Sequence, residues 1–154
     1  MKRLAFLLVF FLLPSMAMSW PGRVVSITDG DTLTVLRGQE QVKIRIYGID
    51  APERRQPWGD RARQALGDLA HGQTVEVLEI DRDRYGRTVA RIEVQGQDVG
   101  LEMVSRGMAW VYERYCKIPD CEAMRQAQEQ AQVDRSGLWS DLAPIPPWEW
   151  RRVK

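Results

Sequence analysis

The stretch RVVSITDGDTLTVL, residues 23–36, decides the fold that we expect for this chain. It contains two runs rich in β-branched residues, 23–27 and 32–36, which are typical of strands. Between them lies Asp29-Gly30, a dipeptide that favours tight hairpin turns. The stretch therefore predicts a β-hairpin near the start of the folded part of the chain.

A third strand is expected over 41–47, where apolar and polar side chains alternate. Lys43, Arg45 and Tyr47 then share the face opposite the core, so that Arg45 faces a surface or a cleft. The remaining two expected strands are 74–80 and 88–94.

Apolar residues at helical spacing predict helices over about 59–70, 98–106 and 122–134, the second with Asp98 as its N-cap. Five short strands, with one helix inserted after the third, favour the OB-fold, a small Greek-key barrel. We therefore expect an α+β protein that is mainly β, with about three helices. Barrels of this type bind oligonucleotides and oligosaccharides, so the fold alone does not separate an enzyme from a binding module.

Residues 1–19 are expected to be a signal peptide that directs export to the periplasm or the medium. Lys2 and Arg3 precede an apolar run, 4–13, and small residues follow it. The length of this run is half of the about 20 apolar residues that a membrane-spanning helix needs. Cleavage after Ser19 is preferred to cleavage after Ala17. An uncleaved membrane anchor is the alternative, because no charge lies between Leu4 and Gly22.

Removal of residues 1–19 would leave 135 residues, with one domain over 20–142 and a Pro- and Trp-rich tail over 143–154. The tail is too rich in proline for a helix, so we expect it to wrap or extend. Loss of Lys2 and Arg3 would leave 20 basic and 21 acidic residues. Because the mature protein is nearly neutral, any affinity for phosphate must be local.

Cys116 and Cys121 are the two cysteines of the chain, and they bracket a short segment with a proline. In an exported protein such a pair predicts a disulfide, which would stabilise the fold by about 2 kcal/mol. The alternative is a metal site, but two thiols and the single histidine, His71, are too few for tetrahedral zinc. One histidine also argues against Ser-His and Cys-His nucleophilic catalysis.

Two aspartates next to turns, Asp31 and Asp50, are candidate metal ligands at one rim of the expected barrel. Oxygen ligands without a nearby histidine or cysteine favour Ca²⁺ or Mg²⁺ over transition metals. Taken alone, Asp29-Gly30-Asp31 would be read as a hydrogen-bonded hairpin turn. The presence of Asp50 and Glu53 after a neighbouring strand favours the metal site.

Glu53 is the candidate general base for phosphodiester hydrolysis, which needs a group that takes a proton from the attacking water. It could instead cap a helix or pair with Arg54 or Arg55. Arg45 and Arg87 are candidates for binding the phosphate, because guanidinium groups stabilise its developing negative charge. Arg87 alone could be a solvated hairpin arginine, but the same turn also carries Arg82 and Arg84, which makes it a local basic ridge.

The chain resembles the staphylococcal nuclease (thermonuclease) family from about Val24 to Trp139. The motifs that carry the resemblance are Asp29-Gly30-Asp31-Thr32, Arg45 five residues before Asp50-Ala51-Pro52-Glu53, Asp83-Arg84-Tyr85-Gly86-Arg87, and Gly137-Leu138-Trp139. The resemblance implies an OB-fold and a Ca²⁺-dependent endonuclease. Its substrates would be DNA and RNA, with little sequence preference, and its products would carry 3′-phosphate ends. We expect a monomer without a stable protein partner. Once the signal peptide is removed, we expect no association with a membrane.

Carried over to this sequence, the resemblance implies that Asp31, Asp50 and the carbonyl of Ala51 bind Ca²⁺, with Asp29 behind them. It further implies Glu53 as the general base and Arg45 and Arg87 as phosphate ligands. The expected substrate contacts are Arg84, Tyr85, Tyr112 and Tyr115. Ala51 stands where the founding member has threonine, which is acceptable where only the carbonyl binds the metal.

Two alternatives remain at this point. The first is a catalytically silent OB-fold module that binds nucleic acid or a protein, although the full set of catalytic residue types argues against it. The second is a Ca²⁺-stabilised barrel that binds saccharide, which would give no purpose to Arg45 and Arg87.

Overall fold

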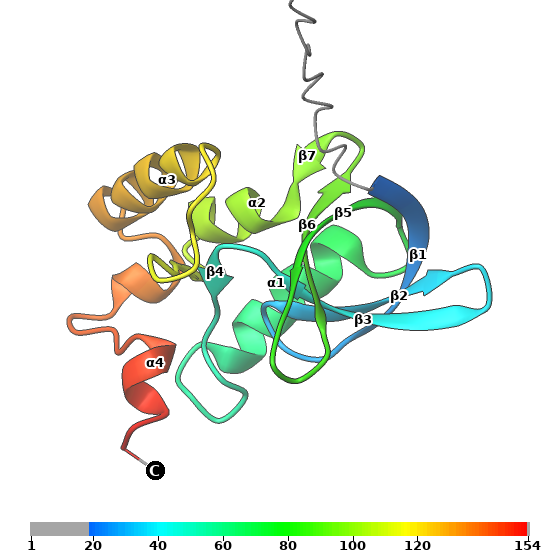
Figure 1. Ribbon diagram of the computed structural model, residues 1–154. Coiled ribbons are helices and arrows are strands. Elements are labelled where there is room, and N and C mark those ends of the chain that lie inside the picture. Colours follow the sequence, from blue (N-terminus) through cyan, green and yellow to red (C-terminus); the bar gives the residue numbers. More distant parts are fainter. Residues whose placement is uncertain (1–18, 154) are drawn as a thin grey trace, which may run out of the picture.

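The computed structural model describes residues 19–153, drawn as a ribbon in Figure 1. The expected signal peptide therefore lies, apart from Ser19, outside the described residues. Five strands form the barrel: β1 (Ser19–Ile27), β2 (Thr32–Arg37), β3 (Glu40–Ile46), β5 (Thr74–Arg82) and β6 (Thr88–Val94). They are hydrogen-bonded in the order β3-β2-β1-β5-β6, and a parallel pairing of β3 with β6 closes the barrel. The predicted OB-fold is confirmed.

The barrel core comes from the alternating inward side chains of these strands. The buried residues of the five strands include Val24, Leu33, Val35, Ile44, Ile46, Val75, Val77, Ala90 and Ile92. Alternation explains why the strand positions could be found from sequence, since successive side chains of a strand point to opposite faces.

Strand β1 begins earlier than expected, at Ser19 rather than Arg23. The added residues pair with β5, Ser19 opposite Leu78 and Trp20 opposite Val77. The Trp20 indole is buried, and its Nε1 donates to Glu79 at 2.6 Å. Pro21 and Gly22 have low strand propensity. Pairing with β5 and burial of the Trp20 indole hold this segment in the sheet, and local propensity does not reveal these contacts.

Three helices pack around the barrel: α1 (Gly59–Ala70), α2 (Val99–Ser105) and α3 (Cys121–Val133). Two short strands, β4 (Ile49–Asp50) and β8 (Trp110–Val111), form a separate antiparallel pair. Strand β7 (Gln97–Asp98) extends the sheet beyond β6. Asp98 accepts from the Leu101 N–H at 2.9 Å, which confirms it as the N-cap of α2.

The C-terminal tail differs from the prediction, because residues Pro147–Trp150 form a short helix, α4. The tail follows a 3₁₀ turn at Gly137–Ser140, and α4 lies beside the loop after β4 (Figure 1). The prediction was wrong at this point because Pro147 occupies the first turn of the helix, where its missing N–H costs no hydrogen bond.

The predicted disulfide between Cys116 and Cys121 is present. The Tyr47 hydroxyl accepts from the Lys117 N–H at 2.7 Å and from the Ile118 N–H at 3.3 Å. Tyr47 is buried, so the expectation that it shares the exposed face of Lys43 and Arg45 was wrong. Strand β3 ends at Ile46, and Tyr47 turns inward to fix the disulfide-closed loop to the barrel.

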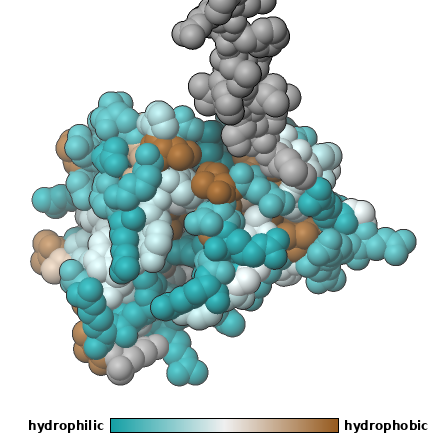
Figure 2. Space-filling view, in the orientation of Figure 1, coloured by the Kyte–Doolittle hydropathy of each residue, from teal (hydrophilic) through white to brown (hydrophobic). Residues whose placement is uncertain are grey.

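Hydrophilic residues cover most of the face drawn in Figure 2, with apolar residues in small, scattered patches. In the part of the chain that the structure describes, no helix has the length and apolar character to span a bilayer.

Candidate active site

Asp31 lies in the turn between β1 and β2, where the chain packs tightly against two neighbours. A Cβ at Gly30 would lie 2.7 Å from both the Ala51 Cβ and the Ala62 Cβ, so only glycine allows this approach. The Asp31 carboxylate accepts from the Ala51 N–H at 2.7 Å and from the Thr32 hydroxyl at 3.0 Å. The turn is therefore fixed to the loop after β4, and Asp31 has a single, buried orientation.

Arg45 brings the two predicted metal ligands together. One end of its guanidinium pairs with Asp31 Oδ1, and the other end, Nη2, pairs with Asp50 Oδ1 at 2.9 Å. Arg45 is on β3 directly opposite Thr32 of β2, and Asp50 ends β4, so the barrel register creates the contact. Residues 31, 45 and 50 thus converge, as the sequence predicted, and the Arg45 side chain is only 15% exposed.

Glu53 lies at the same site, but its partner is neither Arg54 nor Arg55. Its Oε1 accepts from Arg151 Nη1 at 2.8 Å, and the same guanidinium contacts Asp50, with Nη2 2.8 Å from Oδ2. Arg151 was missed by sequence reasoning. It is separated by 101 residues from Asp50, and an arginine after a tryptophan-rich segment carries no local signal of such a contact.

Asp29, Asp31, Asp50 and Glu53 form an acidic cluster. The β5–β6 turn places Arg87 beside it. Its Nη1 lies 3.4 Å from the Thr32 hydroxyl, next to Asp31, and its Nε donates to Asp83 at 2.7 Å. The guanidinium carbons of Arg84 and Arg87 lie 4.8 and 5.6 Å from the Tyr85 ring centroid. Tyr85 is exposed, so the basic ridge and an aromatic surface border the site together.

Tyr112 and Tyr115 form an edge-to-face pair with ring centroids 5.0 Å apart. Trp148 of α4 stacks on Tyr112, with ring centroids 5.3 Å apart and an interplanar angle of 1°. Tyr112 follows β8, which pairs with the β4 strand that carries Asp50, and its N–H donates to Gly48. The structure thus connects Tyr112 to the acidic cluster through the backbone and shows that the tail covers its ring.

Burial disfavours the ionised form of two aspartates at the site, Asp29 and Asp50. Burial raises the pKa of Asp29 to about 7, and the nearby Asp31 carboxylate adds to the rise. Burial also raises the pKa of Asp50, against the opposing effect of Arg151 and Arg45. At Asp31 burial acts in the same direction, but Arg45 and the Ala51 N–H outweigh it and lower the pKa. Such shifts indicate a site where an added cation would be favourable.

The oxygen atoms present suit a weakly held hard cation. Within residues 19–153, no three acidic, histidine or cysteine side chains are arranged as a complete metal cluster. Asp31 and Asp50, joined through one guanidinium, could instead hold Ca²⁺ or Mg²⁺ with the Ala51 carbonyl, and water would complete the shell. Such a site can combine a cation, two arginines and the Glu53 carboxylate, which is paired with Arg151, around one phosphate.

Carboxylates and arginines lie together at one rim of a closed OB barrel. This is the arrangement expected of a small barrel nuclease. The family model described as "Staphylococcal nuclease homologue" matches residues 43–141. An "Uncharacterized endonuclease" of Haemophilus influenzae is 46% identical over 131 residues, which cover 84% of this chain and 72% of that protein. A "Micrococcal nuclease" of Shigella flexneri is 42% identical over 141 residues, which cover 86% of this chain and 80% of that protein. The chain belongs to the staphylococcal nuclease family.

Proposed function

We propose that the chain is a calcium-dependent endonuclease that hydrolyses DNA and RNA with little sequence preference and leaves 3′-phosphate ends. The observation that carries the proposal is the convergence of Asp31, Arg45 and Asp50 at the barrel rim, with Glu53 and Arg87 beside them. Relatives whose names describe an endonuclease and a micrococcal nuclease support the same reaction class.

In this proposal the chain's own residues bind the phosphate and manage one proton. Arg45 and Arg87 donate to the non-bridging phosphate oxygens, whose negative charge grows as water attacks. Glu53 takes a proton from that water, the new P–O bond forms, and the P–O5′ bond breaks. The 5′-oxygen leaves and takes a proton from solvent water, Glu53 returns its proton to solvent, and the other product carries the 3′-phosphate. A Ca²⁺ ion held by Asp31, Asp50 and the Ala51 carbonyl would supply Lewis-acid stabilisation of the phosphate.

Carboxylates could seem a poor surface for a nucleic acid, but the two proposed metal ligands are enclosed. Asp31 and Asp50 are buried, while Arg84, Arg87 and Tyr85 lie on the adjoining turn. The approaching strand would therefore meet guanidinium groups and aromatic rings, with Tyr112 and Tyr115 available for stacking once uncovered.

The proposal includes export as a monomer after cleavage of residues 1–19, with no membrane or stable protein partner. The disulfide supports export, because such bonds persist in oxidising compartments.

Cleavage of single-stranded DNA and of RNA by the purified, disulfide-bonded protein tests the function. We expect cleavage with Ca²⁺ and none with excess chelator, and end-group analysis should find 3′-phosphates. A folded sample that cleaves neither substrate with Ca²⁺, Mg²⁺ or Mn²⁺ would contradict the proposal and favour a binding module.

A further inference from the structure

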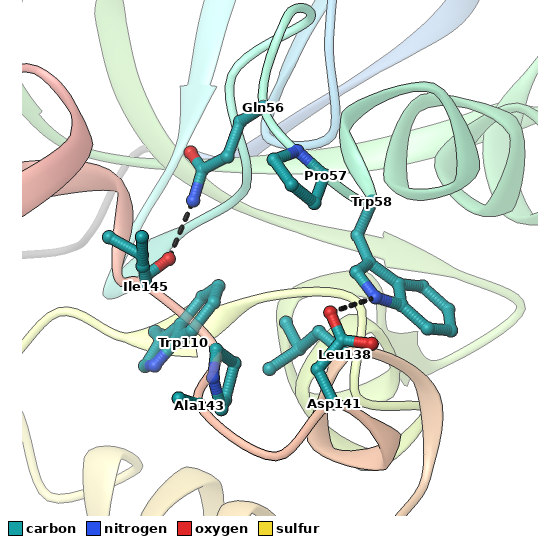
Figure 3. A pocket seen from close by; sticks show the side chains of 9 residues that line it. Gln56, Pro57, Trp58, Trp110, Leu138, Asp141, Ala143 and Ile145 are labelled. Atoms are coloured by element: carbon teal, nitrogen blue, oxygen red, sulfur yellow. Dashed lines mark hydrogen bonds between the residues drawn. The ribbon is translucent and has the colours of Figure 1, made fainter.

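The C-terminal segment, residues 143–153, lies against the loop after β4, and two hydrogen bonds, one within the segment and one just before it, anchor it there. The side-chain amide of Gln56 donates to the Ile145 carbonyl at 2.6 Å. Trp58 Nε1 donates to Asp141 at 3.0 Å just before the segment begins. Figure 3 shows both contacts, with Trp110 and Leu138 beside them. These anchors bring α4 to the loop that carries Glu53.

Trp148 occupies a position on Tyr112 that suits a nucleobase. The two rings are parallel, with an angle of 1° and centroids 5.3 Å apart, and the edge of Trp110 meets Trp148 at 6.4 Å. Bases of single strands stack on aromatic side chains in the same parallel manner. A base cannot stack on this face of Tyr112 while Trp148 lies on it.

Arg151 occupies the acidic cluster in the same segment. Its two terminal nitrogens contact both Asp50 oxygens, at 2.8 and 3.2 Å, and Nη1 also contacts Glu53 at 2.8 Å. One positive group therefore engages the proposed metal ligand and the proposed general base. A divalent cation at Asp50 would compete with Arg151 for the same oxygen lone pairs.

The segment is built to be displaced without unfolding the barrel. Helix α4 has four residues, and among these Pro147 alone is buried. Nearly 60% of the Arg151 side chain is covered, yet its partners belong to the barrel rim rather than the barrel core. Local units with few buried contacts open more readily than the global fold.

We propose that residues 143–153 are an autoinhibitory cover of the nuclease site, with Trp148 in the place of a base and Arg151 in the place of a cation. The inference rests on the proposed function. Binding of Ca²⁺ at Asp50 releases Arg151, and a nucleic-acid strand then displaces Trp148 from Tyr112. Because cover and cation exclude each other, the apparent cation affinity equals the intrinsic affinity multiplied by the fraction of molecules that are open. Cation binding must in turn loosen the cover.

Calorimetric titration of Ca²⁺ without nucleic acid tests the competition directly. Arg151→Ala should bind Ca²⁺ about tenfold more tightly than the natural protein. Arg152→Ala is the matched control, since it removes the same charge from the adjacent, exposed residue, and its affinity should stay within twofold. An unchanged affinity in Arg151→Ala would overturn the inference.

Hydrogen exchange supplies a readout that does not depend on a substitution or on cleavage. Saturating Ca²⁺ should speed exchange at the α4 amides of the natural protein, including the Arg151 N–H that bonds to Pro147. In parallel, Trp148→Ala should increase the affinity for a single-stranded oligonucleotide, by about tenfold. Unchanged exchange, or weaker binding by Trp148→Ala, would contradict the cover.

Cleavage assays separate this inference from the proposed function. Arg151→Ala should cleave faster than the natural protein at limiting Ca²⁺ and at the same rate at saturating Ca²⁺. A raised KM at saturating Ca²⁺ would make Arg151 a substrate-binding residue and overturn the cover. Tighter Ca²⁺ binding by the variant, with no cleavage by either protein, would support the competition and contradict the nuclease proposal.

Discussion

The Asp31 carboxylate and the Ala51 backbone are joined by a hydrogen bond of 2.7 Å, across 20 residues of sequence. The bond uses the Ala51 N–H, so it needs no particular side chain at that position. It fixes the β1–β2 turn against the loop after β4, and the Ala51 carbonyl belongs to the same fixed loop. This arrangement explains how alanine can stand where the founding member of the family has threonine.

Glu53→Gln tests the proposed general base. The substitution keeps the size of the side chain and an oxygen that can accept from Arg151, but it removes proton acceptance. We expect kcat to fall by about 10²–10⁴-fold with an unchanged midpoint of thermal unfolding. Glu129→Gln, on the exposed face of α3, is the control and should keep full activity. A loss of less than tenfold in Glu53→Gln would remove Glu53 from the mechanism.

Arg87→Lys tests phosphate binding by the β5–β6 turn. Lysine keeps the charge but loses the planar fork, so we expect kcat/KM to fall by about 10²-fold. Arg87 also pairs with Asp83, so the loss could come from a disturbed turn. Asp83→Asn breaks that ion pair while retaining the guanidinium. Equal losses in the two variants would assign the effect to the turn rather than to the phosphate contact.

Asp29→Asn tests whether ionisation of the Asp29 carboxyl group lowers the stability of the folded protein. The folded pKa of Asp29 is about 7, above its ordinary value of 3.8, so the folded state holds the proton more tightly than the unfolded state. This group therefore makes the protein less stable as the pH rises from about 4 to 7. Asparagine can still accept from the Asp31 N–H, a bond that Asp29 makes at 3.1 Å.

In chelator, the free energy of unfolding of Asp29→Asn should exceed that of the natural protein by up to about 4 kcal/mol at pH 8 and by little at pH 4. Urea unfolding at the two pH values measures the difference. A benefit that is the same at both would show that Asp29 does not titrate in this range.

Gly30→Ala tests the close packing of the Asp31 turn. The new Cβ would meet Ala51 and Ala62 at 2.7 Å, so the loop or α1 must shift, at a cost of about 2–3 kcal/mol in unfolding free energy. Gly67→Ala, in α1, is the matched control. No atom lies within 4 Å of its added Cβ, and alanine favours a helix, so it should stabilise by up to about 1 kcal/mol. Denaturation of both variants in urea measures the contrast, and similar effects would contradict it.

Replacing Cys116 and Cys121 together by serine tests the disulfide. The closed loop is short, so its removal should lower the free energy of unfolding by about 2 kcal/mol under non-reducing conditions. The two proteins should converge when a reductant is added. If a reductant left the free energy of unfolding of the natural protein unchanged, the protein would not contain the disulfide.

The sequence predicted the parts of this molecule that depend on local patterns. Helix α1 has the predicted bounds, because its apolar spacing and the glycine at its start are local features. Asp31 and Arg45 come together because they border or belong to predicted strands, whereas Asp50 ends the two-residue strand β4, which was not predicted. Local reasoning failed where a contact joins distant segments, as for Trp20 on β5 and for Trp148 on Tyr112. Arg151 belongs to the second kind, since nothing near residue 151 identifies Asp50 as its partner.

The pairing of β3 with β6, which closes the barrel, also determines at which stage of folding the candidate active site forms. Strand β3 meets β6 through pairs such as Ile44 with Thr88, which lie 44 residues apart and run parallel. Loop-closure entropy delays such long-range pairing relative to the hairpins. Arg87 immediately precedes β6 and reaches Thr32 only after closure. A nascent chain that has formed its first hairpins thus carries Asp31 and Arg45 without Arg87, and the site is complete only in the closed barrel.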